Sequence, residues 1–251
     1  LDAQRGLMRV ENSFIPVYGV GETTERSLWR EGVTHWDAFT PEVVGPTTGD
    51  RIEEFLATAR PHLDDGDARF FADAMPDRCH WRLYENFRED TLYFDIETTG
   101  LSKYEDVVTT VSVHRDGETR SYVRGQDLTR DALQSEFADA KLLGSFNGKQ
   151  FDVPFLEQSF DLRLDHPHLD LRFLGERLDL TGGLKTVEQT LDIVRDRPVI
   201  SGRDAVRLWH EYARDGDPDA LETLVSYNQD DARNLATLAD EVTGRLHDRV
   251  F

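Results

Sequence analysis

The chain has 251 residues, a formal net charge of −20 and hydrophobic residues at 38% of its positions, so it is long and apolar enough for two domains, or for one domain with an appendage. No apolar run could span a membrane, and no hydrophobic core of a signal peptide stands near the N-terminus, so we expect no membrane contact. The single cysteine, Cys79, cannot form an internal disulfide, which favours a cytoplasmic protein.

The first residues of the chain raise the question of where translation of the natural protein starts. The chain begins at Leu1 rather than at a methionine, and Met8 follows a few residues later. We expect residues 1–7 to reflect a mis-set start or an alternative start codon, which the mass of the natural protein would distinguish.

The first region, residues 1–88, is expected to form a small all-α domain. Residues 16–21 read Pro-Val-Tyr-Gly-Val-Gly and precede a helical stretch over 22–30, after which Gly32 leads into a second short helix. A further helix over 50–62 carries its apolar side chains on one face. The turn is similar to that of a helix-hairpin-helix motif, whose backbone N–H groups and helix N-terminus bind phosphate without reading sequence. The alternative is a helical cap that packs on the next domain.

A strand is predicted over residues 91–96, because this stretch is aromatic and β-branched and ends at Thr-Thr-Gly. Side chains two apart on a strand share a face, so Asp95 and Glu97 point together while Phe94 and Ile96 face the other layer. Neighbouring carboxylates on a half-buried strand repel each other unless a cation neutralises them. Their oxygens favour a hard ion, Mg²⁺ or Mn²⁺, and one cysteine offers no thiolate site.

The middle of the chain alternates between predicted strands and helices. Residues 107–114 and 119–123 are expected to pair as a hairpin with Asp116-Gly117 as its turn. A helix over 129–138 and a strand over 141–146 follow. This succession predicts an α/β fold with a mixed sheet and helices on both of its faces.

Asp152 is predicted to stand where a strand meets a helix. The strand over 141–146 ends shortly before it, and Pro154 suits the first turn of the helix that follows. Farther along, residues 166–171 enter another strand, and Lys185 opens a helix after two glycines.

The last helix is expected to carry Tyr227 and Asp231. Asp217 and Pro218 are a start signal for it. Residues at three-to-four spacing form a buried stripe, namely Leu221, Leu224, Val225, Asn228, Leu235, Leu238 and Val242. Tyr227 and Asp231 are four residues apart and therefore project from one face. Carboxylates from three distant elements would then converge, as active-site residues on α/β sheets commonly do.

Residues 89–251 resemble the DEDD exonuclease superfamily on the ribonuclease H-like fold. The motifs that carry the resemblance stand in the family's order: Asp-Ile-Glu-Thr-Thr-Gly-Leu from Asp95, Asn-x-x-x-Phe-Asp ending at Asp152, and Tyr-x-x-x-Asp ending at Asp231. The histidine branch has its histidine five residues before the last aspartate, where this chain has Ser226. The chain is therefore most similar to the tyrosine branch and to its predicted RNase H-like exonuclease proteins of bacteria and archaea.

The resemblance implies a two-metal-ion 3′–5′ exonuclease with one role per residue. Asp95 would bridge two Mg²⁺ or Mn²⁺ ions, and Glu97 and Asp231 would complete the first site. Asp152 would hold the second ion, largely through water. Tyr227 would orient the attacking water.

The resemblance also implies contacts with the substrate. Thr98, Thr99 and Leu101 would contact the terminal nucleotide, with Leu101 as an apolar wedge against its base. Asn147 would contact a phosphate or support the metal ligands, and Asp170 would be a support residue near the site. Lys185 is a candidate for a backbone-phosphate contact, with capping of its helix as the alternative. Four arginines form a candidate wall of a nucleic-acid channel: Arg195, Arg197, Arg203 and Arg207.

Three functions stay open. The leading one is an exonuclease that acts at the 3′ ends of DNA or RNA, with DNA favoured because of the phosphate-binding turn in the first region. The second is an endonuclease or structure-selective nuclease on the same fold. The third is a nucleic-acid-binding module without catalysis, which predicts the loss of at least one carboxylate or of Tyr227, and all five residues are present.

The acidic composition predicts a halophilic archaeal source. The chain has 49 acidic and 29 basic residues, and only four of the basic ones are lysines. At about 1 M salt the Debye length is about 3 Å, so repulsion between such a protein and nucleic acid is screened. Unfolding in low salt and recovery in molar KCl are the expected results, and full stability in low salt would contradict the hypothesis.

Overall fold

The computed structural model describes residues 7–195 and 200–251, and the chain divides into two compact units. The N-terminal unit comprises Leu1–Arg88 together with Thr243–Phe251, and the sheet unit comprises Glu89–Val242. No helix among the described residues is both long and apolar enough to cross a membrane.

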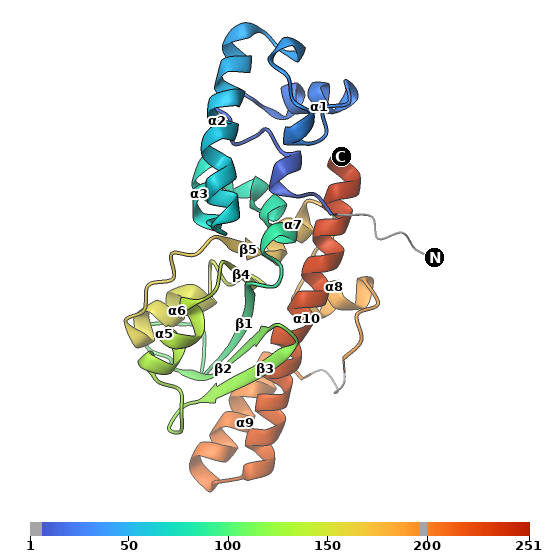
Figure 1. The fold of residues 1–251 in the computed structure, drawn as a ribbon. Helices are drawn as coiled ribbons and strands as arrows, with labels where there is room; N and C mark the ends of the chain where they lie inside the picture. Colours follow the sequence, from blue (N-terminus) through green and yellow to red (C-terminus); the bar gives the residue numbers. More distant parts are fainter. Residues whose placement is uncertain (1–6, 196–199) are drawn as a thin grey trace. The chain divides into compact units, whose positions relative to one another are not determined.

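The N-terminal unit consists of helices and 3₁₀ turns (Figure 1). Its helices are α1 (Glu22–Arg30), α2 (Pro46–Asp64), α3 (Ala68–Ala74) and α4 (Tyr84–Phe87), and its 3₁₀ turns are η1 (Val10–Asn12), η2 (Trp36–Ala38), η3 (Pro41–Val43) and η4 (Asp77–Leu83). Helix α2 starts earlier than predicted because Pro46 suits the first helical position. The short helix expected after Gly32 is present only as the single 3₁₀ turn η2. The backbone returns to an extended conformation at Phe39, and Pro41 follows two residues later.

A buried ion pair lies in the core of the N-terminal unit. Arg82 Nη1 lies 2.7 Å from both carboxylate oxygens of Glu25, and the two side chains are 2% and 0% exposed. Glu25 Oε1 also accepts hydrogen bonds from the Ser13 hydroxyl and the Phe14 backbone N–H, both at 2.8 Å. The Arg82 guanidinium lies 5.8 Å from the ring centre of Trp29. Each charge therefore has an opposite charge and hydrogen bonds to replace the water that it loses.

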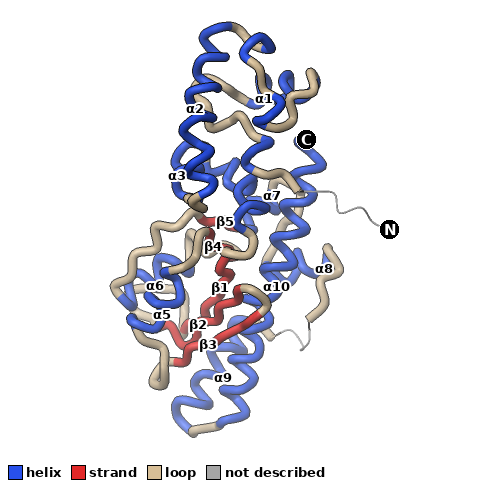
Figure 2. The backbone as a smooth tube through the Cα atoms, in the orientation of Figure 1, coloured by secondary structure: helices blue, strands red, loops and turns tan. Residues whose placement is uncertain are grey.

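The described residues of the sheet unit form a five-stranded sheet with the order β3-β2-β1-β4-β5 (Figure 2). The strands are β1 (Thr91–Thr98), β2 (Val108–Arg115), β3 (Glu118–Val123), β4 (Leu142–Ser145) and β5 (His168–Asp170). Strands β1, β2 and β3 pair antiparallel, whereas β4 pairs parallel with both β1 and β5. The β2–β3 hairpin turns at Asp116 and Gly117, whose φ angles of 51° and 76° suit a two-residue hairpin turn. The predicted mixed sheet is confirmed.

The two faces of the sheet carry different chemistry. Leu92, Phe94 and Ile96 of β1 lie in one hydrophobic core with α5 (Arg130–Ala138) and α6 (Asp152–Phe160). Helix α10 (Pro218–Val250) runs along the other side of the sheet, so helices cover both faces (Figure 1). Because side chains alternate along a strand, the acidic residues of β1 face α10.

The remaining helices lead the chain into α10. They are α7 (Leu171–Glu176), α8 (Leu184–Thr190) and α9 (Gly202–Asp215). Helix α9 begins at a capping box of Ser201 and Asp204 and ends at Gly216, which has a φ angle of 70°. The Asp217 side chain accepts the Asp219 backbone N–H and so caps α10, as its sequence predicts.

Candidate metal centre

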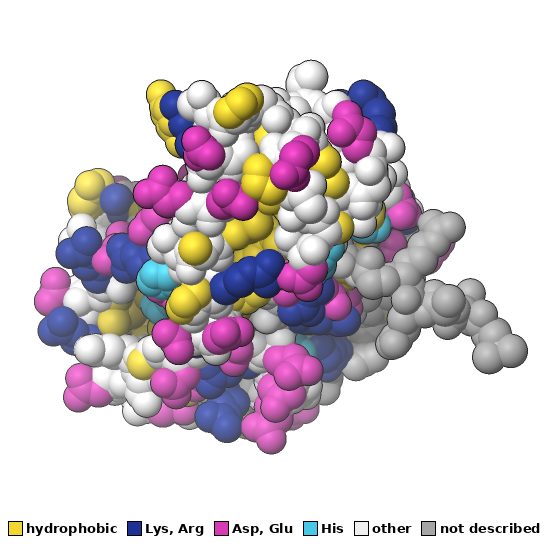
Figure 3. Space-filling view, turned by 45° about the horizontal axis from the view of Figure 1, so that its top comes forward, with side chains coloured by type: hydrophobic (Ala, Val, Ile, Leu, Met, Phe, Trp, Pro, Cys, Tyr) yellow, Lys and Arg dark blue, Asp and Glu magenta, His cyan; other side chains and the backbone are white. Residues whose placement is uncertain are grey.

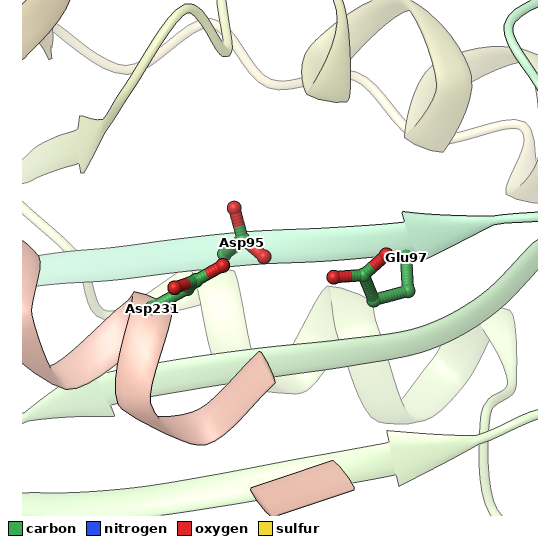
Figure 4. Close-up of side chains that lie close together, drawn as sticks. All are labelled: Asp95, Glu97 and Asp231. Atoms are coloured by element: carbon green, nitrogen blue, oxygen red, sulfur yellow. The ribbon is translucent and has the colours of Figure 1, made fainter. Parts of the chain in front are cut away.

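Three carboxylates converge between β1 and α10. Asp95 and Glu97 lie two residues apart on β1, and Asp231 extends toward them from α10 (Figure 4). Their ligand oxygens all lie within 4.8 Å of one another. We call these three residues the carboxylate cluster. It joins two of the three predicted acidic motifs.

Asn228 connects the two elements of the cluster. Its Nδ2 donates to Asp95 Oδ2 at 2.7 Å, and its Oδ1 accepts from the Thr110 hydroxyl of β2 at 3.1 Å. Asn228 is fully buried and lies one turn before Asp231 on α10. It therefore fixes the orientation of the Asp95 carboxylate. Sequence analysis counted Asn228 only as a member of the buried stripe, although a polar side chain at an apolar position was the available signal.

Asp152 lies at the start of α6, outside the carboxylate cluster but within its electrostatic field. It is buried, and its negative charge contributes to a raised pKa at Asp95. Repulsion from Asp231 in turn contributes to the raised pKa of Asp152. The third predicted motif is thus close enough to the cluster to interact with it.

A tight turn between β4 and α6 presents Asp152. The Asp170 carboxylate at the end of β5 accepts the backbone N–H groups of Asn147 at 2.8 Å and Lys149 at 3.1 Å. Asn147 has a φ angle of 66°, and its side-chain oxygen accepts from Arg172 at 2.8 Å. Asp170 therefore holds the turn in place, while a phosphate contact by Asn147 stays a prediction.

Burial and mutual repulsion disturb the titration of all four acids. Burial raises the pKa of Asp95 well above its ordinary value, with repulsion from the other three carboxylates adding to the shift. Burial likewise raises the pKa of Glu97 to about 8 and that of Asp152 to about 7. Burial also raises the pKa of Asp231, against the opposing charges of Arg195 and Lys185. Without a further cation, Glu97 therefore retains its proton at neutral pH.

The donor set fits a hard divalent cation. All candidate ligands are carboxylate oxygens, which suit Mg²⁺ or Mn²⁺. Within the described part of the chain, the buried Asp231 Oδ1 has no hydrogen-bond donor in acceptable geometry. A cation at the cluster would satisfy this oxygen and remove the repulsion among the carboxylates.

Two basic side chains approach the cluster from outside. The Lys185 Nζ donates to the Tyr227 hydroxyl and, at 2.9 Å, to the Ile200 carbonyl oxygen. Arg195 Nη1 lies 2.5 Å from Asp231 Oδ1. From the sequence, Lys185 was a candidate for a phosphate contact and Arg195 for the wall of a nucleic-acid channel. Their positions beside Tyr227 and Asp231 were not predicted.

The other members of the predicted basic stretch lie elsewhere. Arg203 and Arg207 belong to α9, and Arg207 pairs with Glu211 on the surface at 2.7 Å. Arg197 lies outside the described residues. The structure therefore does not gather the four arginines into one described surface, and their contact with nucleic acid stays a prediction.

The loop after β1 presents two exposed side chains. The Thr98 hydroxyl donates to the Gly100 carbonyl oxygen, and the Thr99 hydroxyl donates to Asp106 at 3.2 Å and accepts the Val107 backbone N–H at 3.0 Å. These hydrogen bonds hold the loop in place, and within it Leu101 is 87% exposed and Tyr104 is 77% exposed.

Tyr104 is a residue that sequence analysis missed. It lies three residues after the predicted wedge Leu101, and Lys103 Nζ lies 5.4 Å from its ring centre. An aromatic residue beside one of only four lysines was the signal in the sequence.

Comparison with known proteins shows the family and the fold. The profile of a family described as RNase_H superfamily matches residues 92–243. The family B DNA polymerase from the archaeon Pyrobaculum calidifontis is similar in structure, with a TM-score of 0.52 and 20% identity over 61% of this chain and 24% of the polymerase. The chain thus matches about a quarter of that polymerase, and the likeness shows the fold alone.

Two structures of NrnC from Brucella melitensis are also similar. NrnC with bound Mg²⁺ has a TM-score of 0.46 and 18% identity over 66% of this chain and 78% of NrnC. NrnC bound to pGG has a TM-score of 0.46 and 19% identity over 64% of this chain and 77% of NrnC. No curated protein matches the chain in sequence.

Proposed function

The chain belongs to the RNase H superfamily, and from its carboxylate cluster we propose that it is a divalent-metal-dependent nuclease that removes nucleotides from the 3′ end of nucleic acid. The observation that carries this proposal is the meeting of Asp95 and Glu97 with Asp231, with Asp152 in the same field. In this proposal residues 89–251 are the nuclease domain, of the tyrosine branch of the DEDD exonucleases.

Each side chain has a definite task in the proposed reaction. Asp95, Glu97 and Asp231 would hold one divalent ion, and Asp95 and Asp152 would help to hold a second. Two such ions supply an activated water and stabilise the leaving 3′ oxygen. Tyr227 orients the attacking water, and the hydrogen bond from Lys185 keeps the tyrosine hydroxyl in place.

The loop after β1 is the proposed binding site of the terminal nucleotide. Thr98 and Thr99 support this loop through their hydroxyl groups. The exposed Leu101 and Tyr104 are free to stack against bases, and base–aromatic stacking contributes about 1–3 kcal/mol per base. Lys185 is the proposed contact for a backbone phosphate. These features favour an unpaired 3′ end over an internal phosphodiester.

The N-terminal unit is a proposed second contact with nucleic acid. Gly19 has a φ angle of 86°, and Gly21 is the N-cap of α1 without a side-chain cap. The backbone N–H groups of this turn and of the first turn of α1 would bind phosphate in the manner of a helix-hairpin-helix motif. This contact favours DNA over RNA as the substrate.

The surface charge is the reason to expect activity at high salt. Acidic and basic side chains are interspersed over the face shown in Figure 3. With a net charge of −20 the protein would repel nucleic acid at low salt, whereas molar salt screens that repulsion. A halophilic archaeal source with a KCl-rich cytoplasm fits these properties.

Digestion of labelled nucleic acids in molar KCl tests the proposed function. Single- and double-stranded DNA and RNA, labelled at the 3′ or the 5′ end, are incubated with MgCl₂ or MnCl₂. The wild type is compared with Asp152→Asn and Tyr227→Phe. Asp230→Asn is the matched control, because Asp230 neighbours Asp231 on α10 but pairs with Arg233 at 2.7 Å and lies outside the carboxylate cluster.

A ladder that shortens from the 3′ end is the expected result. It is absent with Asp152→Asn, slowed with Tyr227→Phe and retained with Asp230→Asn. Internal cuts that Asp152→Asn abolishes would replace the exonuclease with an endonuclease at the same site. A folded wild type that cleaves none of the substrates would overturn the proposal and favour a binding module without catalysis.

A further inference from the structure

Arg195 is buried beside the carboxylate cluster with two acidic partners. Its Nη1 lies 2.5 Å from Asp231 Oδ1, and its Nη2 lies 2.5 Å from Glu188 Oε2. Its Nε also donates to Glu188 Oε2 at 2.6 Å. Its side chain is only 9% exposed. The guanidinium therefore bridges one acid of the carboxylate cluster and one acid outside it.

Glu188 is anchored independently of the carboxylate cluster. Asn234 Nδ2 donates to Glu188 Oε1 at 3.0 Å, and Asn234 lies three residues after Asp231 on α10. Glu188 is buried on α8 and lies outside the carboxylate cluster. An arginine that left Asp231 would therefore still have a fixed, buried carboxylate to pair with.

The contact between Arg195 and Asp231 is ionic rather than a well-directed hydrogen bond. Asp231 Oδ1, which faces Arg195 Nη1, is buried and has no hydrogen-bond partner in acceptable geometry among the described residues. The same holds for Arg195 Nη2, which faces Glu188. The bonds from Arg195 Nε to Glu188 and from Asn234 to Glu188 do satisfy that geometry. The guanidinium thus has an aligned hydrogen bond to Glu188 through Nε, whereas its contact with Asp231 is ionic.

A metal ion and the guanidinium cannot both use Asp231 Oδ1 without repulsion. An Mg²⁺ ion binds carboxylate oxygen at about 2.0–2.1 Å. A guanidinium nitrogen 2.5 Å from the same oxygen would place its positive charge against the ion. Withdrawal of Arg195 from Asp231 would relieve this repulsion, and Glu188 is the acceptor that would allow it.

We propose that Arg195 is a counter-ion of the metal centre. In the metal-free protein it neutralises the Asp231 carboxylate. When the first divalent ion binds, Arg195 leaves Asp231 and pairs with Glu188 alone. This inference rests on the proposed function, because it assumes an ion at the carboxylate cluster. It makes Arg195 and Glu188 positioning residues that set metal affinity in opposite directions. Removal of the Arg195 charge removes a competitor of the ion, whereas removal of the Glu188 charge leaves Arg195 with Asp231 alone.

Titration calorimetry with MnCl₂ on the full chain, stripped with EDTA and kept in molar KCl, tests this inference. We expect Arg195→Gln to bind Mn²⁺ about tenfold more tightly than the wild type, because a competing positive charge is removed. We expect Glu188→Gln to bind Mn²⁺ about tenfold more weakly, at the low end of the roughly 10–100-fold losses that follow removal of an outer-shell partner. Arg207→Gln is the matched control, because Arg207 belongs to the same basic stretch but pairs with Glu211 on the surface. Its Mn²⁺ affinity should equal that of the wild type. Circular dichroism shows whether each variant is folded.

The sign of the change decides the outcome. Weaker or unchanged Mn²⁺ binding by Arg195→Gln overturns the inference, because an arginine that only positions Asp231 would support the ion. If Arg195→Gln does not fold, Glu188→Gln decides alone, and unchanged or tighter binding overturns the inference. A wild type that cleaves nucleic acid and binds Mn²⁺, with no response in these variants, would leave the proposed function intact. A wild type that neither binds Mn²⁺ nor cleaves would overturn both proposals.

Discussion

The N-terminal unit buries one acid with one base, whereas the sheet unit gathers four acids. Asp152 and Asp231 are buried, and Asp95 and Glu97 are partly buried. Glu25 and Arg82 form an ion pair, and the Glu25 carboxylate accepts further hydrogen bonds from the Ser13 hydroxyl and the Phe14 backbone N–H. In the sheet unit, burial raises the pKa of Glu97 to about 8, and repulsion from Asp231 adds to the shift. A compensated pair supports the fold, but an excess of buried like charges costs stability and indicates a ligand.

The hydrogen bonds of one carboxylate oxygen from each unit show the same contrast. Glu25 Oε1 accepts from the Ser13 hydroxyl, the Phe14 backbone and Arg82, all within the core of its unit. Asp231 Oδ1 has an ionic neighbour but no aligned donor among the described residues. The neighbours of Glu25 satisfy its carboxylate, whereas Asp231 Oδ1 would gain a partner if a cation were bound at the carboxylate cluster. Three sets of substitutions test this difference between the two units.

The largest effect is expected from breaking the compensated pair. Arg82→Met leaves the Glu25 carboxylate buried without its base and should lower the free energy of unfolding by about 3–5 kcal/mol. Denaturation followed by circular dichroism in molar KCl measures this. The double variant Arg82→Met with Glu25→Gln carries no buried charge and should recover much of the loss. Equal stability of the single and the double variant would contradict the argument.

A smaller effect of opposite sign is expected at the carboxylate cluster. Glu97 has an ordinary pKa of 4.5, raised to about 8 in the folded protein. Between these values the folded state binds more protons than the unfolded state, so this group makes the metal-free protein less stable as pH rises from about 4.5 to about 8. Glu97→Gln in EDTA should therefore match the wild type at low pH and be more stable above pH ~8, by roughly 2 kcal/mol or more.

Thermal unfolding at several pH values checks the Glu97 prediction. With about 2–4 °C per kcal/mol for a domain of this size, the gain is easily seen in EDTA. Saturating Mn²⁺ should reverse the order, because only the wild type keeps the full ligand set. A Glu97→Gln protein that is less stable than the wild type in EDTA at high pH would show that the acids are compensated after all.

The smallest effect is expected at the residue that orients Asp95. Asn228→Ala removes the donor to Asp95 Oδ2 and should weaken Mn²⁺ binding roughly tenfold, as loss of an outer-shell partner does. Thr110→Val only releases the Asn228 side-chain oxygen and should have a still smaller effect. Calorimetry on both variants measures the Mn²⁺ affinity of each and therefore the difference between them. If the two substitutions weakened Mn²⁺ binding equally, the hydrogen bonds from Thr110 through Asn228 to Asp95 would act as one unit.

Local patterns in the sequence predicted much of this arrangement. Alternation along β1 places Asp95 and Glu97 on one face, and the structure brings both to Asp231. The Asp116-Gly117 turn and the Asp217 start signal are found where they were predicted. The helix expected after Gly32 was wrong, because a short apolar stretch between a glycine and a proline does not distinguish a helix from a 3₁₀ turn.

The order of the acidic motifs and the face on which each acid lies follow from the sequence, because side-chain direction is set by the period of a strand or a helix. The compensation of those acids depends instead on contacts between distant elements. Asp95 meets Asn228 across 133 positions and Glu188 meets Asn234 across 46, while Asp231 meets Arg195 from another element. Electrostatic compensation depends on distance in space and on burial, and neither can be read from neighbouring letters.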